Sequence, residues 1–107
     1  MKFATHNDKP GINTNMSSLQ GYIQATRANL IRVFGEPQDF GPGDKVSLQW
    51  GIEFADGTVA TLYDWKRDEA PEIHEVYDWH IGGFTTHAVR AVHNAYREDR
   101  GLLARSA

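Results

Sequence analysis

A pair of glycines followed by threonines is the segment of this sequence with the clearest potential for chemistry. Gly82 and Gly83 follow an aromatic stretch and precede Phe84, and the apolar spacing beyond them predicts a helix from Thr85 or Thr86. Free backbone N–H groups at a helix start bind anions, and glycine lets a ligand approach the backbone closely. The pair is therefore a candidate anion site, with a turn, bulge or helix cap as the structural alternative.

Polar residues on the predicted second helix extend this candidate site. Arg90, Asn94 and Arg97 recur at i, i+4 and i+7 and so share one side of a helix. The preceding phenylalanine offers a stacking plane, the asparagine a paired donor and acceptor, and arginine a fork that fits phosphate oxygens. Arg27, which opens the first predicted helix, is a further cation. The set suits a mononucleotide-like ligand; the alternative is that the arginines pair with nearby carboxylates or solvate the helix.

Other arrangements that could do chemistry are weaker. The five histidines show no metal-binding spacing and the chain has no cysteine, so we expect no metal site and no cofactor. There is no P-loop, dinucleotide fingerprint or nucleophile elbow. Asp64 and Asp78 could work as an acid and base only if they converge, and the alternative is two solvated carboxylates at strand ends. We therefore expect no catalytic residues, and we interpret His80 as a hydrogen-bonding or stacking residue.

Composition narrows the class of protein. The 107 residues suffice for one domain with one core, and 40% of them are hydrophobic. The formal charge of −3 argues against duplex nucleic acid as a partner, but small anions need only two or three cations and stay open. No stretch is apolar enough for a membrane span or reads as a secretory signal, so we expect no membrane partner and an intracellular location.

Periodicity and turn residues predict the elements that position these side chains. Residues 1–16 read as a flexible N-terminal arm and residues 17–107 as a single domain. A short strand over 18–23 leads to a helix that is capped at Thr26 and stopped at Gly35. The order strand, helix, three strands, helix predicts an α+β fold: an antiparallel sheet of about four strands with two helices packed on one face.

The central hairpin gives the strongest of these signals. Residues 45–54 alternate with period two, and Asp56-Gly57 predicts a two-residue type I′ turn. That turn places Phe54 opposite Val59 and assigns alternate residues of the second strand to two faces. One is a core face, or core at one end and ligand wall at the other, and the opposite face is partly wet. The residues expected on the core face are Val59, Thr61, Tyr63 and Trp65, and those expected on the wet face are Ala60, Leu62 and Asp64.

Four strings in this chain resemble a family of small phage proteins. At 18–23, 34–37, 50–66 and 78–83 the sequence reads SLQGYI, FGEP, WGIEFADGTVATLYDWK and DWHIGG. Together they resemble the first-described anti-Thoeris family, phage sponges that sequester cyclic ADP-ribose-type immune signals. The resemblance extends over about residues 17–97.

The resemblance implies a non-enzymatic protein of the host cytoplasm that binds a signalling nucleotide without cleaving it. It implies a homo-oligomer, a dimer or hexamer, with ligand sites at subunit junctions, and some members also hold cyclic oligonucleotides of the CBASS type at separate sites. The family's aromatic and asparagine contacts would fall on Phe84 and Asn94. Its arginine near the start of the first helix would be Arg27, and a further arginine would be Arg100 or Arg105.

Two other function classes stay open on the sequence alone. An inhibitor that binds a host defence protein directly would fit the negative charge and the exposed side of the hairpin. A small nucleotide-processing enzyme would use Asp64, Asp78 or His80. Recovery of unchanged ligand, capture of a host protein, or turnover of the nucleotide would distinguish the three.

Overall fold

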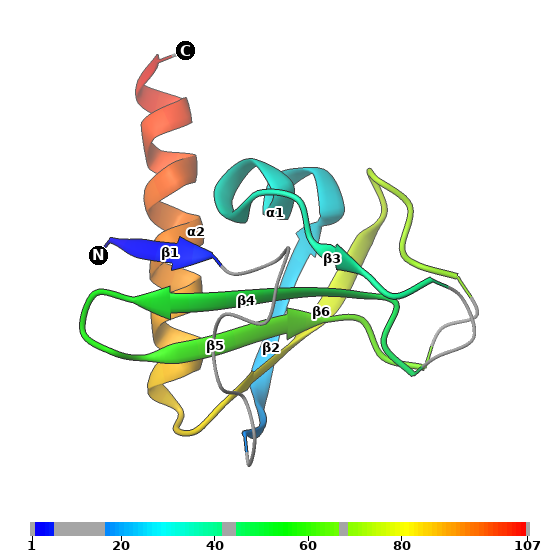
Figure 1. Ribbon diagram of the computed structural model, residues 1–107. Coiled ribbons are helices and arrows are strands. Elements are labelled where there is room, and N and C mark those ends of the chain that lie inside the picture. The colour runs from blue at the N-terminus through cyan, green and yellow to red at the C-terminus, as the bar shows by residue number, and fades with distance from the viewer. Residues whose placement is uncertain (1, 6–16, 42–44, 67–68, 107) are drawn as a thin grey trace.

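The computed structural model describes residues 2–5, 17–41, 45–66 and 69–106, with side chains as far as residue 98. These residues form an α+β fold. Figure 1 shows its helices and strands. In chain order they are β1 (Phe3–Thr5), β2 (Ser18–Thr26), α1 (Arg27–Phe34), β3 (Gln38–Asp39), β4 (Leu48–Phe54), β5 (Val59–Tyr63), β6 (Val76–Gly83) and α2 (His87–Ser106).

The strands form one antiparallel sheet in the order β1-β4-β5-β6-β2, with β3 also paired to β4. The predicted fold class, antiparallel sheet and two helices are confirmed. The sheet has two more strands than predicted, because β1 and β3 have three and two residues, too few for a periodic signal. β1 lies within the segment predicted to be a flexible arm, and residues 6–16 of that segment lie outside the described residues.

Both helices pack on the same face of the sheet, where the core lies (Figure 1). α1 forms as predicted: the Thr26 hydroxyl accepts a hydrogen bond from Asn29 N at 3.2 Å, and Gly35 ends the helix with φ +81°. In the core, the fully buried rings of Trp50 and Trp79 meet edge to face, with centroids 5.2 Å apart. We call the opposite side of the sheet, on which no described helix packs, the helix-free face.

In the β4–β5 hairpin three residues, 55–57, connect the paired residues Phe54 and Thr58, and the predicted two-residue turn is wrong. Phe54 N donates to the Thr58 carbonyl at 2.8 Å, and Gly57 N donates to the Phe54 carbonyl at 2.9 Å. Gly57 has φ +89°, the left-handed residue that closes a three-residue hairpin. The Asp56 carboxylate accepts from Thr58 N at 3.0 Å, and this hydrogen bond holds the pKa of Asp56 below its usual value.

The extra loop residue shifts the register of the hairpin by one. Ile52 lies opposite Ala60 and Trp50 opposite Leu62, where the shorter turn predicted Thr61 and Tyr63. A shift of one residue moves every side chain of a strand to the other face of the sheet. The expected faces of β5 are therefore reversed: Ala60, Leu62 and Asp64 are fully buried beneath the helices, whereas Val59, Thr61 and Tyr63 lie on the helix-free face.

The glycine pair is part of strand β6 and does not form the start of the second helix, where the sequence predicted it. Gly82 and Gly83 are buried and pair with β5 on one side and β2 on the other. α2 begins later than predicted, at His87. A Cβ on Gly83 would lie 2.6 Å from the Cβ of Ala88, so this glycine lets the first turn of α2 approach the sheet closely.

Candidate functional site

Aromatic side chains gather on the helix-free face of the sheet. Gln49, Tyr63, His80 and Tyr22 lie directly opposite one another across β4, β5, β6 and β2. The His80 ring lies 4.9 Å from the Tyr22 ring and 5.4 Å from the Tyr63 ring, centroid to centroid. Trp65, just beyond β5, lies 6.3 Å from both Tyr63 and His80. We call Tyr22, Tyr63, Trp65 and His80 the aromatic cluster.

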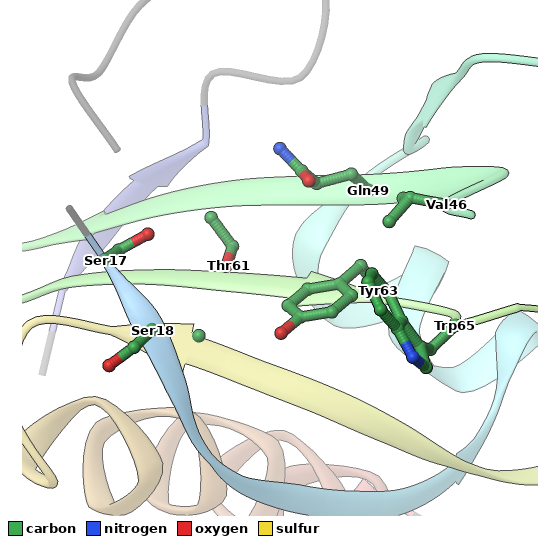
Figure 2. A pocket seen from close by; sticks show the side chains of 8 residues that line it. Ser17, Ser18, Val46, Gln49, Thr61, Tyr63 and Trp65 are labelled. Atoms are coloured by element: carbon green, nitrogen blue, oxygen red, sulfur yellow. The ribbon is translucent and has the colours of Figure 1, made fainter. Parts of the chain in front are cut away.

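A hollow of about 220 Å³ lies beside the aromatic cluster, and we call it the trough (Figure 2). Two of its lining residues are small, Thr61 and Gly82, and they lie opposite one another on β5 and β6. A Cβ on Gly82 would lie 2.5 Å from the Thr61 hydroxyl oxygen and 3.3 Å from the Tyr63 ring. Because Gly82 has no side chain, the surface of the sheet stays open at this point and forms part of the floor of the trough. The lining residues are Ser17, Ser18, Val46, Gln49, Thr61, Tyr63, Trp65 and Gly82.

The two ends of the trough differ in chemistry. Figure 2 shows Tyr63 and Trp65 next to each other at one end, and the hydroxyls of Ser17 and Ser18 at the other. The Ser18 hydroxyl is held by Gln20, whose Nε2 donates to it at 3.0 Å and to the Gly83 carbonyl at 3.1 Å. The trough therefore offers stacking planes at one end and hydrogen-bonding groups at the other.

Positive charge lies at the Trp65 end of the trough. The ammonium groups of Lys45 and Lys66 lie 6.0 and 5.8 Å from the centroid of the Trp65 ring, within the range of cation–π interactions. Burial, with a smaller contribution from Tyr22, raises the pKa of the Tyr63 phenol, so this hydroxyl keeps its proton and can donate a hydrogen bond. The arrangement suits an aromatic ligand that carries an anionic group.

Acidification is expected to destabilise the fold through His80. Burial lowers the pKa of His80 below 6.5 against a weaker opposing effect of Asp64, and its buried Nδ1 has no hydrogen-bond partner among the described residues. Near and below pH 6.5 the unfolded chain therefore binds more protons than the folded chain, so stability falls as the pH falls. Urea unfolding at pH 7, 6 and 5 should show this loss, and His80→Gln should reduce it. An identical pH dependence in the two proteins would contradict the assignment.

The structure places three predicted site residues close to the trough. Gly82 lines it, and Gly83 follows on the same strand beneath α2. Phe84 is half exposed and lines a second hollow of about 260 Å³, between the β4–β5 loop and the start of α2. Phe84 is thus accessible on the surface, and its role as a stacking plane stays a prediction.

The other predicted residues lie away from the trough. Arg90, Asn94 and Arg97 are exposed on α2, on the side opposite to the stripe that packs on the sheet, so sheet and helix separate them from the trough of the same chain. Arg27 lies at the other end of β2 from the residues paired with Gly82, roughly 25 Å away by strand rise, and donates to the Pro71 carbonyl at 3.2 Å. The side chain of Arg105 lies outside the described residues.

The carboxylates considered for acid–base chemistry do not converge. Asp64 is fully buried on the core face, where one carboxylate oxygen accepts from Ser47 N at 2.8 Å and Leu48 N at 3.0 Å. Asp78 is exposed and shares the helix-free face with His80, two residues along β6. Within the described part of the chain, no three His, Asp or Glu side chains are grouped as a metal would require. No helix in that part is long and apolar enough to cross a membrane.

Sequence reasoning missed the aromatic cluster as a site. Tyr63 and Trp65 were assigned to the core face because of the hairpin register, and Tyr22 was assigned only to a strand. The predicted stacking role of His80 agrees with its ring contacts. A three-residue loop closed by Gly57 would have put Tyr63 on the correct face.

A comparison of this chain with protein-family models, with curated proteins and with solved structures finds no match.

Proposed function

We propose that this protein binds a small signalling nucleotide and retains it without cleaving it. The observation that carries the proposal is the aromatic cluster beside the trough, with Lys45 and Lys66 at its Trp65 end. Aromatic side chains on a sheet stack on bases whatever the base, and nearby cations attract phosphate. The proposal agrees with the resemblance to anti-Thoeris sponges, which adds a phage origin and the host cytoplasm.

The size and charge of the site favour a short ligand. The trough, at about 220 Å³, is smaller than the roughly 300–1,000 Å³ of typical small-molecule pockets, so it suits one base and part of its sugar. A chain with a formal charge of −3 is poorly suited to a long polyanion. One nucleotide unit, free or within a cyclic molecule, is the expected occupant.

The side chains that line the trough support retention without cleavage. They are hydroxyl, amide, aromatic and small groups, which position a ligand, and the imidazole nearby, His80 of the aromatic cluster, contacts the rings of Tyr22 and Tyr63. Sequestration needs strong binding, about −12 kcal/mol at a nanomolar Kd. An open trough binds a ligand more strongly when a second copy of the chain covers it and excludes water. We therefore propose that the protein works as a homo-oligomer.

Titration calorimetry and mass spectrometry test the function directly. We expect the purified protein to bind at least one cyclic ADP-ribose isomer or cyclic oligonucleotide, and heat denaturation to release the ligand with its mass unchanged. Failure to bind any such molecule would refute the proposal. A changed mass would identify an enzyme instead, and capture of a host defence protein without nucleotide binding would identify a direct inhibitor.

A further inference from the structure

We infer that Lys45 and Lys66 form a phosphate-binding subsite at the Trp65 end of the trough. The inference rests on the proposed nucleotide binding and specifies how the ligand lies: the phosphate at the lysines, the base on the rings of the aromatic cluster that line the trough, and the sugar between them. Three observations about this pair of lysines support it.

The first observation is that the fold brings the two lysines together. Lys66 N donates a hydrogen bond to the Lys45 carbonyl at 2.6 Å, so residues far apart in sequence are adjacent at the end of the hairpin. Their ammonium groups both lie within about 6 Å of the Trp65 ring centroid. Two cations at the same ring attract an anion that binds beside it.

The second observation is the backbone of Lys66. Its φ is +53°, the one positive value among the non-glycine residues that the structure describes. This left-handed conformation is unfavourable for a residue with a Cβ, and glycine or asparagine adopts it more easily. Unfavourable backbone conformations concentrate at ligand-binding positions. A lysine at this position is explained if its ammonium group has a role that asparagine cannot fill.

The third observation is that Trp65 joins the lysines to the trough. Its ring lines the trough and also lies under both ammonium groups. Its backbone N–H donates to the Tyr77 hydroxyl at 3.1 Å, which ties this segment to β6. A nucleotide whose base lies in the trough therefore has both cations at one end. Lysine acts on phosphate as a point charge and needs no fixed approach angle, which suits a phosphomonoester or a phosphodiester.

The test compares AMP with adenosine, because the two differ only in the phosphate. Calorimetry at low salt should show that the wild-type protein binds AMP about tenfold more tightly than adenosine, since each exposed ion pair contributes up to about 1 kcal/mol. The double variant Lys45→Gln/Lys66→Asn should bind the two equally, with its adenosine affinity within about twofold of wild type. Raising the salt concentration should weaken AMP binding to the wild type alone.

The outcomes separate this inference from the proposed function. Equal affinity of the wild type for AMP and adenosine would overturn the phosphate subsite while leaving nucleotide binding intact. Binding of neither, together with no cyclic nucleotide, would overturn both. Lys66→Asn alone should match or exceed the wild type in thermal stability, because asparagine tolerates the left-handed backbone. A marked loss of stability would show that the lysine is retained for packing and would count against the inference.

Discussion

Replacing Asp64 by alanine is expected to lower the free energy of unfolding by about 2–5 kcal/mol. The Asp64 side chain is fully buried and accepts hydrogen bonds from the backbone N–H groups of Ser47 and Leu48. Without it, two buried donors lose their partner, and each costs about 1–3 kcal/mol. Asp64 thereby fixes the point at which the chain enters β4, opposite the end of β5. For a domain whose free energy of unfolding is about 5–15 kcal/mol, this loss is a large fraction of the total stability.

Urea unfolding of three variants measures this effect. Asp64→Asn keeps a carbonyl oxygen in the accepting position and should retain most of the stability. Asp78→Ala removes an exposed carboxylate from the other face of the sheet and should stay within about 0.5 kcal/mol of wild type. A loss of under 1 kcal/mol in Asp64→Ala would contradict the assignment of this buried carboxylate as the cap of the β4 backbone.

The elements that depend on local signals could be predicted from the sequence. The first helix is an example, because its cap at Thr26 and its end at Gly35 rest on side-chain and backbone preferences of single residues. The α+β class follows from the order of the elements. β1 could not be predicted, because it is stable only when paired with β4, whose partner residues lie 47 to 51 positions away in the chain.

The hairpin register could not be predicted from Asp56-Gly57. The same dipeptide serves a two-residue type I′ turn and a three-residue loop that ends with glycine in the left-handed region. β5, unlike β4, carries apolar residues on each face, so its hydrophobic pattern does not decide between the two. The length of this loop, two residues or three, therefore determines whether Tyr63 is part of the core or of the aromatic cluster.

The glycine pair shows a second limit of sequence reasoning. The glycines were interpreted as a place where a ligand approaches the backbone, or as a turn, bulge or cap, and neither Gly82 nor Gly83 has a positive φ. Each is needed for the absence of a Cβ, next to Thr61 and Tyr63 in one case and next to Ala88 in the other. Such a requirement comes from residues on other elements, so it is invisible until the strands and α2 are placed.

Nucleotide binding is expected to depend on Tyr63 more than on the exposed side of α2. Stacking of a base on an aromatic side chain contributes about 1–3 kcal/mol, so Tyr63→Ala should weaken binding roughly 5- to 150-fold. Tyr63→Phe keeps the ring and removes the phenol, and should lose only the contribution of one hydrogen bond, roughly two- to tenfold. Thermal melting of the unliganded variants would show whether each is folded.

Asn94→Ala is the matched control variant on the exposed side of α2. Asn94 is exposed on the side of α2 that faces away from the sheet, so its loss should leave binding to the trough within about twofold of wild type. The reverse result, strong loss in Asn94→Ala and none in Tyr63→Ala, would move the ligand to α2 and to a junction between subunits, as the family resemblance implies. Strong loss in both would mean that the α2 of one copy covers the trough of another, because within one chain the sheet separates these two side chains.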